Sequence, residues 1–146
     1  MRLVIASDHG GYELKEWLRE QFAESSHTIE DLGPYNSDSV DYPDYAARVA
    51  GKVADGEADR GILVCGSGIG MSIAANKVDG IRAAVVQDVA HALLAAEHNN
   101  ANILCLGARF TAPPLAADIT DAWLTQECSG PRHHRRVQKI MDLQGH

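Results

Sequence analysis

The sequence has few of the features that mark exported, membrane or nucleic-acid-binding proteins. Its 146 residues include three cysteines, Cys65, Cys105 and Cys128, which lie far apart and form no CxxC pair. An odd number of cysteines without a secretory-type N-terminus predicts a reducing cytoplasm. The apolar runs have the length of strands, so no transmembrane helix is expected. A net charge of −7 disfavours general binding to nucleic acid.

Several motifs that would identify a chemistry are also missing. No group of histidines and cysteines has zinc-ligand spacing, and the adjacent His133 and His134 would point in different directions on a helix. There is no Gly-Lys-Ser/Thr of a Walker A loop. A cysteine phosphatase loop would need arginine six residues after Cys65, where Met71 stands. We therefore expect neither a metal nor a cofactor.

What is present is a regular alternation of short apolar runs and amphipathic segments. The strands are predicted at residues 3–7, 27–32, 61–65, 81–86 and 103–106. Helices are predicted at residues 14–22, 41–55, 72–77, 88–98, 111–123 and 132–143. Strands that alternate with helices predict a single α/β domain over residues 1–146, with a five-stranded parallel sheet between two helical layers in the Rossmann-like style. The last predicted helix follows a break at Ser129-Gly130-Pro131, and its basic residues and apolar stripe could pack on a partner subunit.

The third predicted strand carries the most informative feature of the sequence. Cys65 is its last residue and is followed by the glycine-rich turn Gly66-Ser67-Gly68-Ile69-Gly70. Ligands of open α/β sheets bind at the carboxyl ends of the strands. Glycines allow backbone N–H groups to approach an anion, and a helix that begins near Gly70 would direct its positive end to the same place. Both effects favour the reactive thiolate. A buried structural thiol remains the alternative.

Further polar residues are expected at the same edge of the sheet. Asp8 and His9 follow the first strand, Arg109 follows the fifth, and the helix after the fourth strand ends at His98. Arg132 and Arg136 are spaced i, i+4 on the last helix, so they share a face that suits phosphate recognition. The alternatives are a C-terminal helix cap for His98 and a solvated basic face for the arginines. Together these groups suit proton abstraction beside the carbonyl of a phosphorylated small molecule.

These residues resemble a known family over nearly the whole chain. The matching motifs include Asp8-His9-Gly10-Gly11, Asp41-Tyr42-Pro43, residues 61–70, Ala74-Ala75-Asn76-Lys77, His98-Asn99 and Gly107-Ala108-Arg109. They are similar to the ribose-5-phosphate isomerase B branch of the ribose/galactose isomerase family. The resemblance implies a metal-independent aldose–ketose isomerase of the pentose phosphate pathway. It interconverts ribose 5-phosphate and ribulose 5-phosphate through a cis-enediolate, in a homodimer or tetramer with the site between subunits.

The resemblance also implies a role for each matching residue. Cys65 corresponds to the base that moves a proton between C1 and C2, and His98 to the acid/base that opens the furanose ring. The implied substrate-binding residues are Asp8 and His9 for the sugar, Gly66, Ser67, Gly68, Ile69 and Gly70 for the enediolate, Asn99 for a further contact, and Arg109, Arg132 and Arg136 for the phosphate.

Two details place the sequence within the family. Members with a glutamate base carry it at the position of Met71, so this chain fits the cysteine branch. Ser67 stands where close relatives often have threonine, and the hydroxyl is kept.

Two alternative functions are also compatible with the sequence. A hexose 6-phosphate such as that of allose or galactose could be the substrate, or the chain could bind a phosphosugar without catalysis. Thiol-redox chemistry is disfavoured because no resolving cysteine lies nearby in sequence.

Overall fold

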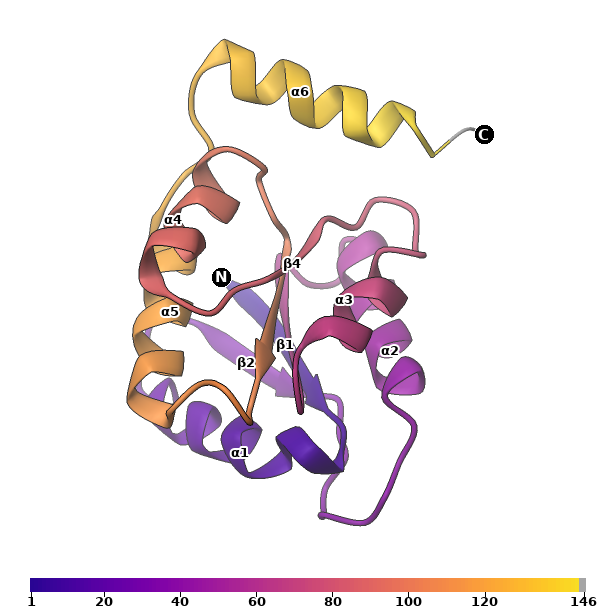
Figure 1. Ribbon diagram of the computed structural model, residues 1–146, viewed down its shortest axis with the longest axis vertical. Helices are drawn as coiled ribbons and strands as arrows, with labels where there is room; N and C mark the ends of the chain where they lie inside the picture. The colour runs from indigo at the N-terminus through magenta and orange to yellow at the C-terminus, as the bar shows by residue number, and fades with distance from the viewer. Residues whose placement is uncertain (145–146) are drawn as a thin grey trace.

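Five apolar segments form one parallel sheet in the computed structural model, which describes residues 1–144 (Figure 1). The strands are β1 (Arg2–Ser7), β2 (Thr28–Asp31), β3 (Arg60–Cys65), β4 (Ala83–Val85) and β5 (Ile103–Gly107). Their order is β2-β1-β3-β5-β4, and all neighbours are parallel. The predicted five-stranded parallel sheet is confirmed. The edge strand β4 is shorter than expected because only three of its residues pair with β5.

Helices cover both faces of this sheet, as the sequence predicts (Figure 1). They are α1 (Tyr12–Gln21), α2 (Tyr42–Ala54), α3 (Ile69–Ala75), α4 (Val89–Glu97), α5 (Pro113–Thr125) and α6 (Pro131–Asp142), with a 3₁₀ turn η1 (His9–Gly11) before α1. α1, α4 and α5 form one layer, and α2 and α3 form the other. A right-handed crossover that runs one way along the sheet places its helix on one face. A crossover that runs the other way places its helix on the opposite face.

Each face of the sheet has its own hydrophobic core. Leu3, Ile5 and Trp123 belong to the core under α1, α4 and α5, whereas Val4 and Ala6 belong to the core under α2 and α3. Successive residues of β1 therefore point to opposite faces.

One expectation about α4 is wrong. The spacing of its apolar residues predicts Leu94, with Val89 and Leu93, on the buried face, but Leu94 is 43 % exposed. The small residues Ala92, Ala95 and Ala96 face the core instead.

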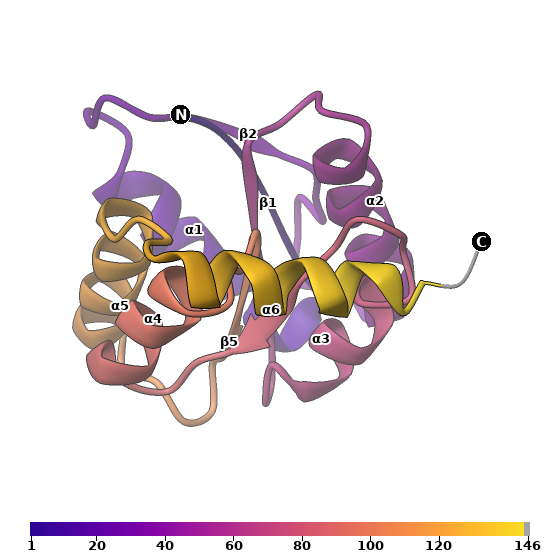
Figure 2. The ribbon, with the colours of Figure 1, turned by 90° about the horizontal axis from the view of Figure 1, so that it is seen from above.

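The last helix, α6, stands apart from the two layers. It begins after Gly130, whose φ of 90° turns the chain, and it passes over the amino ends of the strands (Figures 1 and 2). Val137 on the apolar stripe of α6 is buried, but Ile140 on the same stripe is 43 % exposed. Packing of α6 on a partner subunit therefore stays a prediction.

Within residues 1–144, no helix combines the length and apolarity required to cross a bilayer.

A buried ion pair fixes the segment that follows β2. The side chain of Lys15 is fully buried on α1, and its Nζ lies 2.8 and 2.9 Å from the two carboxylate oxygens of Asp31. Nζ also donates to the carbonyl of Pro34 at 2.6 Å. The pattern of apolar residues in α1 does not predict that Lys15 is buried, because a lysine next to Leu14 is expected to lie on the exposed face.

We expect Lys15→Met to destabilise the protein by about 3–5 kcal/mol, because it leaves the carboxylate of Asp31 buried without its main partner. Asp31 is only 8 % exposed, and its remaining cation is Arg19, at 3.4 Å. Urea unfolding followed by circular dichroism measures the change. The double variant Lys15→Met/Asp31→Leu should recover much of the loss. An unfolding free energy unchanged in the single variant would contradict this assignment.

Candidate active site

Three loops meet at the carboxyl edge of the sheet and form the candidate site. They follow β1, β3 and β5, which are adjacent in the sheet. The chain leaves β1 and β5 toward the layer of α1 and α5, but it leaves β3 toward the layer of α3. Such reversals of direction open a crevice at the carboxyl ends of the strands, where ligands of open α/β sheets bind.

Cys65 lies at this carboxyl edge of the sheet, as predicted. It is the last residue of β3 and is 5 % exposed. The backbone N–H of Gly68 donates a hydrogen bond to its Sγ at 3.1 Å. Gly68 has a φ of 79°, and this left-handed conformation, which glycine adopts without strain, turns the loop back over the sulfur. The thiol therefore faces an N–H dipole of its own loop.

The helix after this loop begins near Gly70, as expected, although the predicted range of residues 72–77 starts too late. α3 begins at Ile69, and the N–H of Ile69 donates to the hydroxyl of Ser67 at 3.2 Å. It has only seven residues. The loop amides, more than the dipole of so short a helix, therefore supply the positive potential near Cys65.

The loops after β3 and β5 are locked together. Ala108 donates its N–H to the carbonyl of Cys65 at 2.8 Å, and Arg109 donates to that of Gly66 at 3.0 Å. A Cβ on Gly66 would lie 3.1 Å from Nε of Arg109, so the arginine side chain lies against this glycine. A Cβ on Gly107 would lie 2.6 Å from the carbonyl oxygen of Ser67. The close approach of the two loops brings Arg109 to the glycine loop, as predicted.

The loop after β1 lies on the other side of the glycine loop. The N–H of Asp8 donates to the carbonyl of Val64 at 3.1 Å, and its Oδ1 accepts from the N–H of Gly11 at 3.0 Å. The N–H of Val40 donates to Nδ1 of His9 at 3.2 Å. Nδ1 is therefore an acceptor, and a neutral His9 carries its proton on Nε2, where it can donate to a ligand.

The other predicted site residues lie at the opposite edge of the sheet. Asp88 caps the start of α4 by accepting from the N–H of His91 at 2.7 Å, and His98 is the C-cap at the far end. Nine helical residues make α4 roughly 14 Å long. The expectation that His98 and Asn99 share an edge with Cys65 is therefore wrong for a single chain. A helix that follows a parallel strand returns to the amino edge.

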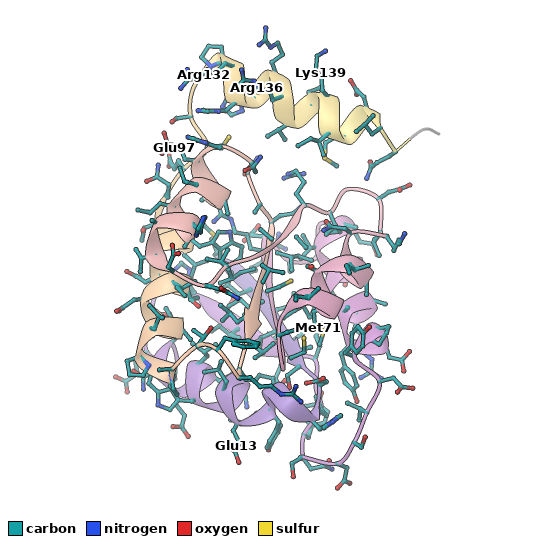
Figure 3. The ribbon with its side chains drawn as sticks, viewed as in Figure 1. Glu13, Met71, Glu97, Arg132, Arg136 and Lys139 are labelled. Atoms are coloured by element: carbon teal, nitrogen blue, oxygen red, sulfur yellow. The ribbon has the colours of Figure 1, made fainter. Side chains whose placement is uncertain are left out.

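The arginines of α6 lie at that amino edge too. Figure 3 shows Arg132 and Arg136 above Glu97, near the start of α6, whereas Met71, on α3, lies far below them. A cleft of about 790 Å³ opens at the same edge, lined by residues of α6 and by the segments around β4, with Arg82, Asn99 and Met141 among them. The predicted site is thus divided into a carboxyl-edge half and an amino-edge half.

The amino-edge half contains a histidine pair that the sequence did not predict. The rings of His98 and His133 stack with centroids 4.1 Å apart and an interplanar angle of 16°. His133 is 7 % exposed, whereas His134 is exposed, so the two adjacent histidines do diverge. Burial, and then the charges of His98 and Arg132, lower the pKa of His133. The pair joins two helices that are far apart in sequence, which no local pattern reveals.

The remaining cysteines do not belong to either half. Cys105 is fully buried within β5, as expected for a structural thiol. Burial, with a smaller effect from Cys65, raises the pKa of Cys105 well above the ordinary thiol range, so this thiol is inert at neutral pH. Cys128 lies between α5 and α6, with its Sγ 4.0 Å from Nδ1 of His134.

Comparison with known proteins identifies the family. Residues 3–140 match the family described as Ribose/Galactose Isomerase. The chain belongs to this family. It is 42 % identical over 143 residues to ribose-5-phosphate isomerase B of Escherichia coli (strain K12), an alignment that covers 98 % of this chain and 96 % of the relative.

Solved structures of the ribose/galactose isomerase family have the same fold. Ribose-5-phosphate isomerase B of Clostridium thermocellum superposes with a TM-score of 0.97 at 49 % identity, covering 99 % of this chain and 97 % of the other. The enzyme of Mycoplasma genitalium, solved with bound ribulose-5-phosphate, gives a TM-score of 0.95 at 43 % identity, covering 98 % and 95 %. The family resemblance of the sequence is thereby confirmed, together with the Rossmann-like fold.

Proposed function

We propose that this chain interconverts D-ribose 5-phosphate and D-ribulose 5-phosphate at a site assembled from two copies of the chain. The observation that carries the proposal is the position of Cys65, a thiol at the end of a central strand under a loop whose Gly68 N–H points at its sulfur. Membership of the ribose/galactose isomerase family, and a relative with bound ribulose-5-phosphate, support the substrate. We assign the reaction to the cytoplasm, where a reducing environment keeps Cys65 reduced.

In this proposal Cys65 is the base of the isomerisation. Its thiolate takes the proton from C2 of the open-chain aldose, which leaves a cis-enediolate. The same sulfur returns a proton to C1, while the hydroxyl proton of O2 passes to O1, so that the ketose forms with no net gain or loss of protons. Backbone N–H groups of Gly66–Gly70 stabilise the developing oxyanion, an interaction whose removal commonly costs about 10²–10³ in rate.

His98 opens the sugar ring in the same proposal. The furanose has no free carbonyl, so a proton must leave the anomeric hydroxyl and another must reach the ring oxygen before C2 becomes acidic. An imidazole can do both because it donates and accepts near neutral pH. In one chain, His98 and Cys65 are separated by roughly the length of α4, too far for both to touch one pentose.

A second copy removes this difficulty. If a two-fold axis brings the amino edge of one chain against the carboxyl edge of the other, both edges are used twice and two identical sites form. Exposed apolar side chains are available for such a contact: Ile69 and Ile73 on α3 are 56 % and 59 % exposed, and Leu94 and Ile140 are 43 % exposed each. Tetramers would need a further contact between such pairs.

The phosphate is held by arginines in this arrangement. Arg132 and Arg136 share a face of α6 and come with His98 from one chain, whereas Arg109 comes with Cys65 from the other. Asp8 and His9 would contact the sugar hydroxyls, and Asn99 would contact the substrate beside His98. Binding energy from the distant phosphate can then orient C1 and C2 at the sulfur.

The test is to follow ribulose 5-phosphate formation from ribose 5-phosphate by the purified chain with EDTA present. We expect turnover without added metal. No turnover on this substrate, but conversion of allose 6-phosphate or galactose 6-phosphate, would replace the pentose with a hexose. Calorimetric binding of these sugars without conversion of any would instead support a non-catalytic binding protein.

A further inference from the structure

We propose that Glu97, His98 and His133 form a binding site for a divalent transition-metal ion of the zinc type, and that the bound ion inhibits the enzyme. The three side chains come from two elements. Glu97 and His98 are the last residue and the C-cap of α4, and His133 lies in the first turn of α6. Figure 3 shows Glu97 directly below the start of α6. The inhibition rests on the proposed function, but the binding does not.

The first argument is the spacing of the possible ligand atoms. One ring nitrogen from each histidine and one carboxylate oxygen of Glu97 all lie within 4.8 Å of one another. Two imidazoles and a carboxylate are a known ligand set for zinc, with bonds of about 2.0–2.2 Å. Tetrahedral bonds of that length put neighbouring ligand atoms roughly 3.4 Å apart. The ligand atoms must therefore move closer by up to about 1.4 Å, and a fourth position stays open to water.

The second argument concerns the ring geometry. A metal ion lies in the plane of each imidazole that binds it, but the rings of His98 and His133 are stacked face to face, 4.1 Å apart. Both can bind the same ion only if one ring turns. His133 is 7 % exposed and is held by its surroundings, so the ring of the less buried His98 is the one that turns. Metal binding and the stacked arrangement therefore exclude each other.

The third consideration is the charge around the cluster. Arg132 and Arg136 repel a cation here, and the carboxylate of Glu97 offsets part of that repulsion.

Inhibition follows from the identity of one ligand. The ring nitrogen of His98 that holds the ion cannot carry a proton to or from the sugar. An ion on this cluster therefore blocks ring opening without any contact to Cys65. Magnesium should not have this effect, because it prefers oxygen ligands and keeps its waters.

The binding test uses ZnCl₂ and isothermal titration calorimetry on the full chain. Cys65→Ala/Cys128→Ser serves as the starting protein, so that neither of these two thiols can capture the ion. We expect it to bind Zn²⁺. Adding His133→Phe, which keeps a stacked ring, or Glu97→Gln should weaken binding by at least about tenfold, the smallest effect usual even for an outer partner of a metal ligand. His134→Phe, at the exposed neighbouring position, is the matched control and should bind as before.

Activity supplies the second readout. Wild-type isomerisation should fall as ZnCl₂ is added, recover with EDTA and not respond to MgCl₂, while Glu97→Gln should need about tenfold more zinc for the same inhibition. The metal site is overturned if the starting protein binds no Zn²⁺, or if His133→Phe binds it equally well. A chain that binds Zn²⁺ as expected but never isomerises a sugar phosphate would refute the proposed function and leave the metal site standing.

Discussion

Cys65→Ala is expected to lower kcat by about 10²- to 10⁴-fold, the usual contribution of a positioned general base. The side chain lies at the end of β3, 5 % exposed, and its sulfur accepts the N–H of Gly68. Alanine leaves the strand, the glycine loop and the arginines proposed to bind the phosphate in place, so substrate should still bind. The measurement is the initial rate of ribulose 5-phosphate formation, with the thermal unfolding midpoint as a check on the fold.

Two matched variants make this result specific. Cys128→Ser removes a partly exposed thiol away from the glycine loop and should leave kcat unchanged. Cys105→Ala removes a fully buried thiol from β5 and should affect stability more than rate. Near-normal turnover by Cys65→Ala, with the fold intact, would mean that another group takes the proton.

Mixing two inactive proteins is expected to restore activity. In the proposed mechanism, Cys65→Ala lacks the base at the carboxyl edge, and His98→Ala lacks the acid/base at the amino edge. After subunits exchange at random, half of the dimers contain one chain of each kind, and one of their two sites then has both native residues. Activity should rise from near zero to about a quarter of wild type, as two-fold symmetry requires.

This experiment separates a shared site from a site within one chain. If Cys65 and His98 acted within the same chain, no mixture of the two variants could contain an intact site, and activity would stay near zero. The control is the double variant Cys65→Ala/His98→Ala mixed with His98→Ala, which contains no intact His98 and should remain inactive. Exchange is verified by native mass spectrometry of chains with different tags.

Much of this architecture follows from local patterns. The sequence correctly places the glycine loop and Cys65 at the end of the third strand, because a buried apolar run that ends in small residues is typical of a strand followed by a turn. That this strand is central in the sheet comes from the structure. The sequence predicts too long a strand for β4, because apolar residues such as Ile81 and Val86 continue beyond its paired residues. It predicts a buried Leu94 because a hydrophobicity pattern does not show that alanines can provide the close contact with the core.

The candidate site was harder to predict because it depends on direction along the fold. The sequence pattern groups His98 with Cys65, although a helix that follows a parallel strand must return to the amino edge. This rule needs only the order of strands and helices, so it predicts the divided site from sequence. The stack of His98 on His133 and the burial of Lys15 against Asp31 depend instead on contacts between distant segments. Neither histidine pairing nor a buried lysine leaves a periodic signal.

The length of α4 has a consequence for how the proposed enzyme responds to dilution. A chain whose thiol and ring-opening histidine lie at opposite edges has no complete site when it is alone. The proposed activity therefore depends on the concentration of paired chains and falls when the protein is diluted. Substrate that bridges two chains also strengthens their association, by about 2.7 kcal/mol at a hundredfold excess over its Kd when only the pair binds. The sugar phosphate would thus help to assemble the catalyst that consumes it.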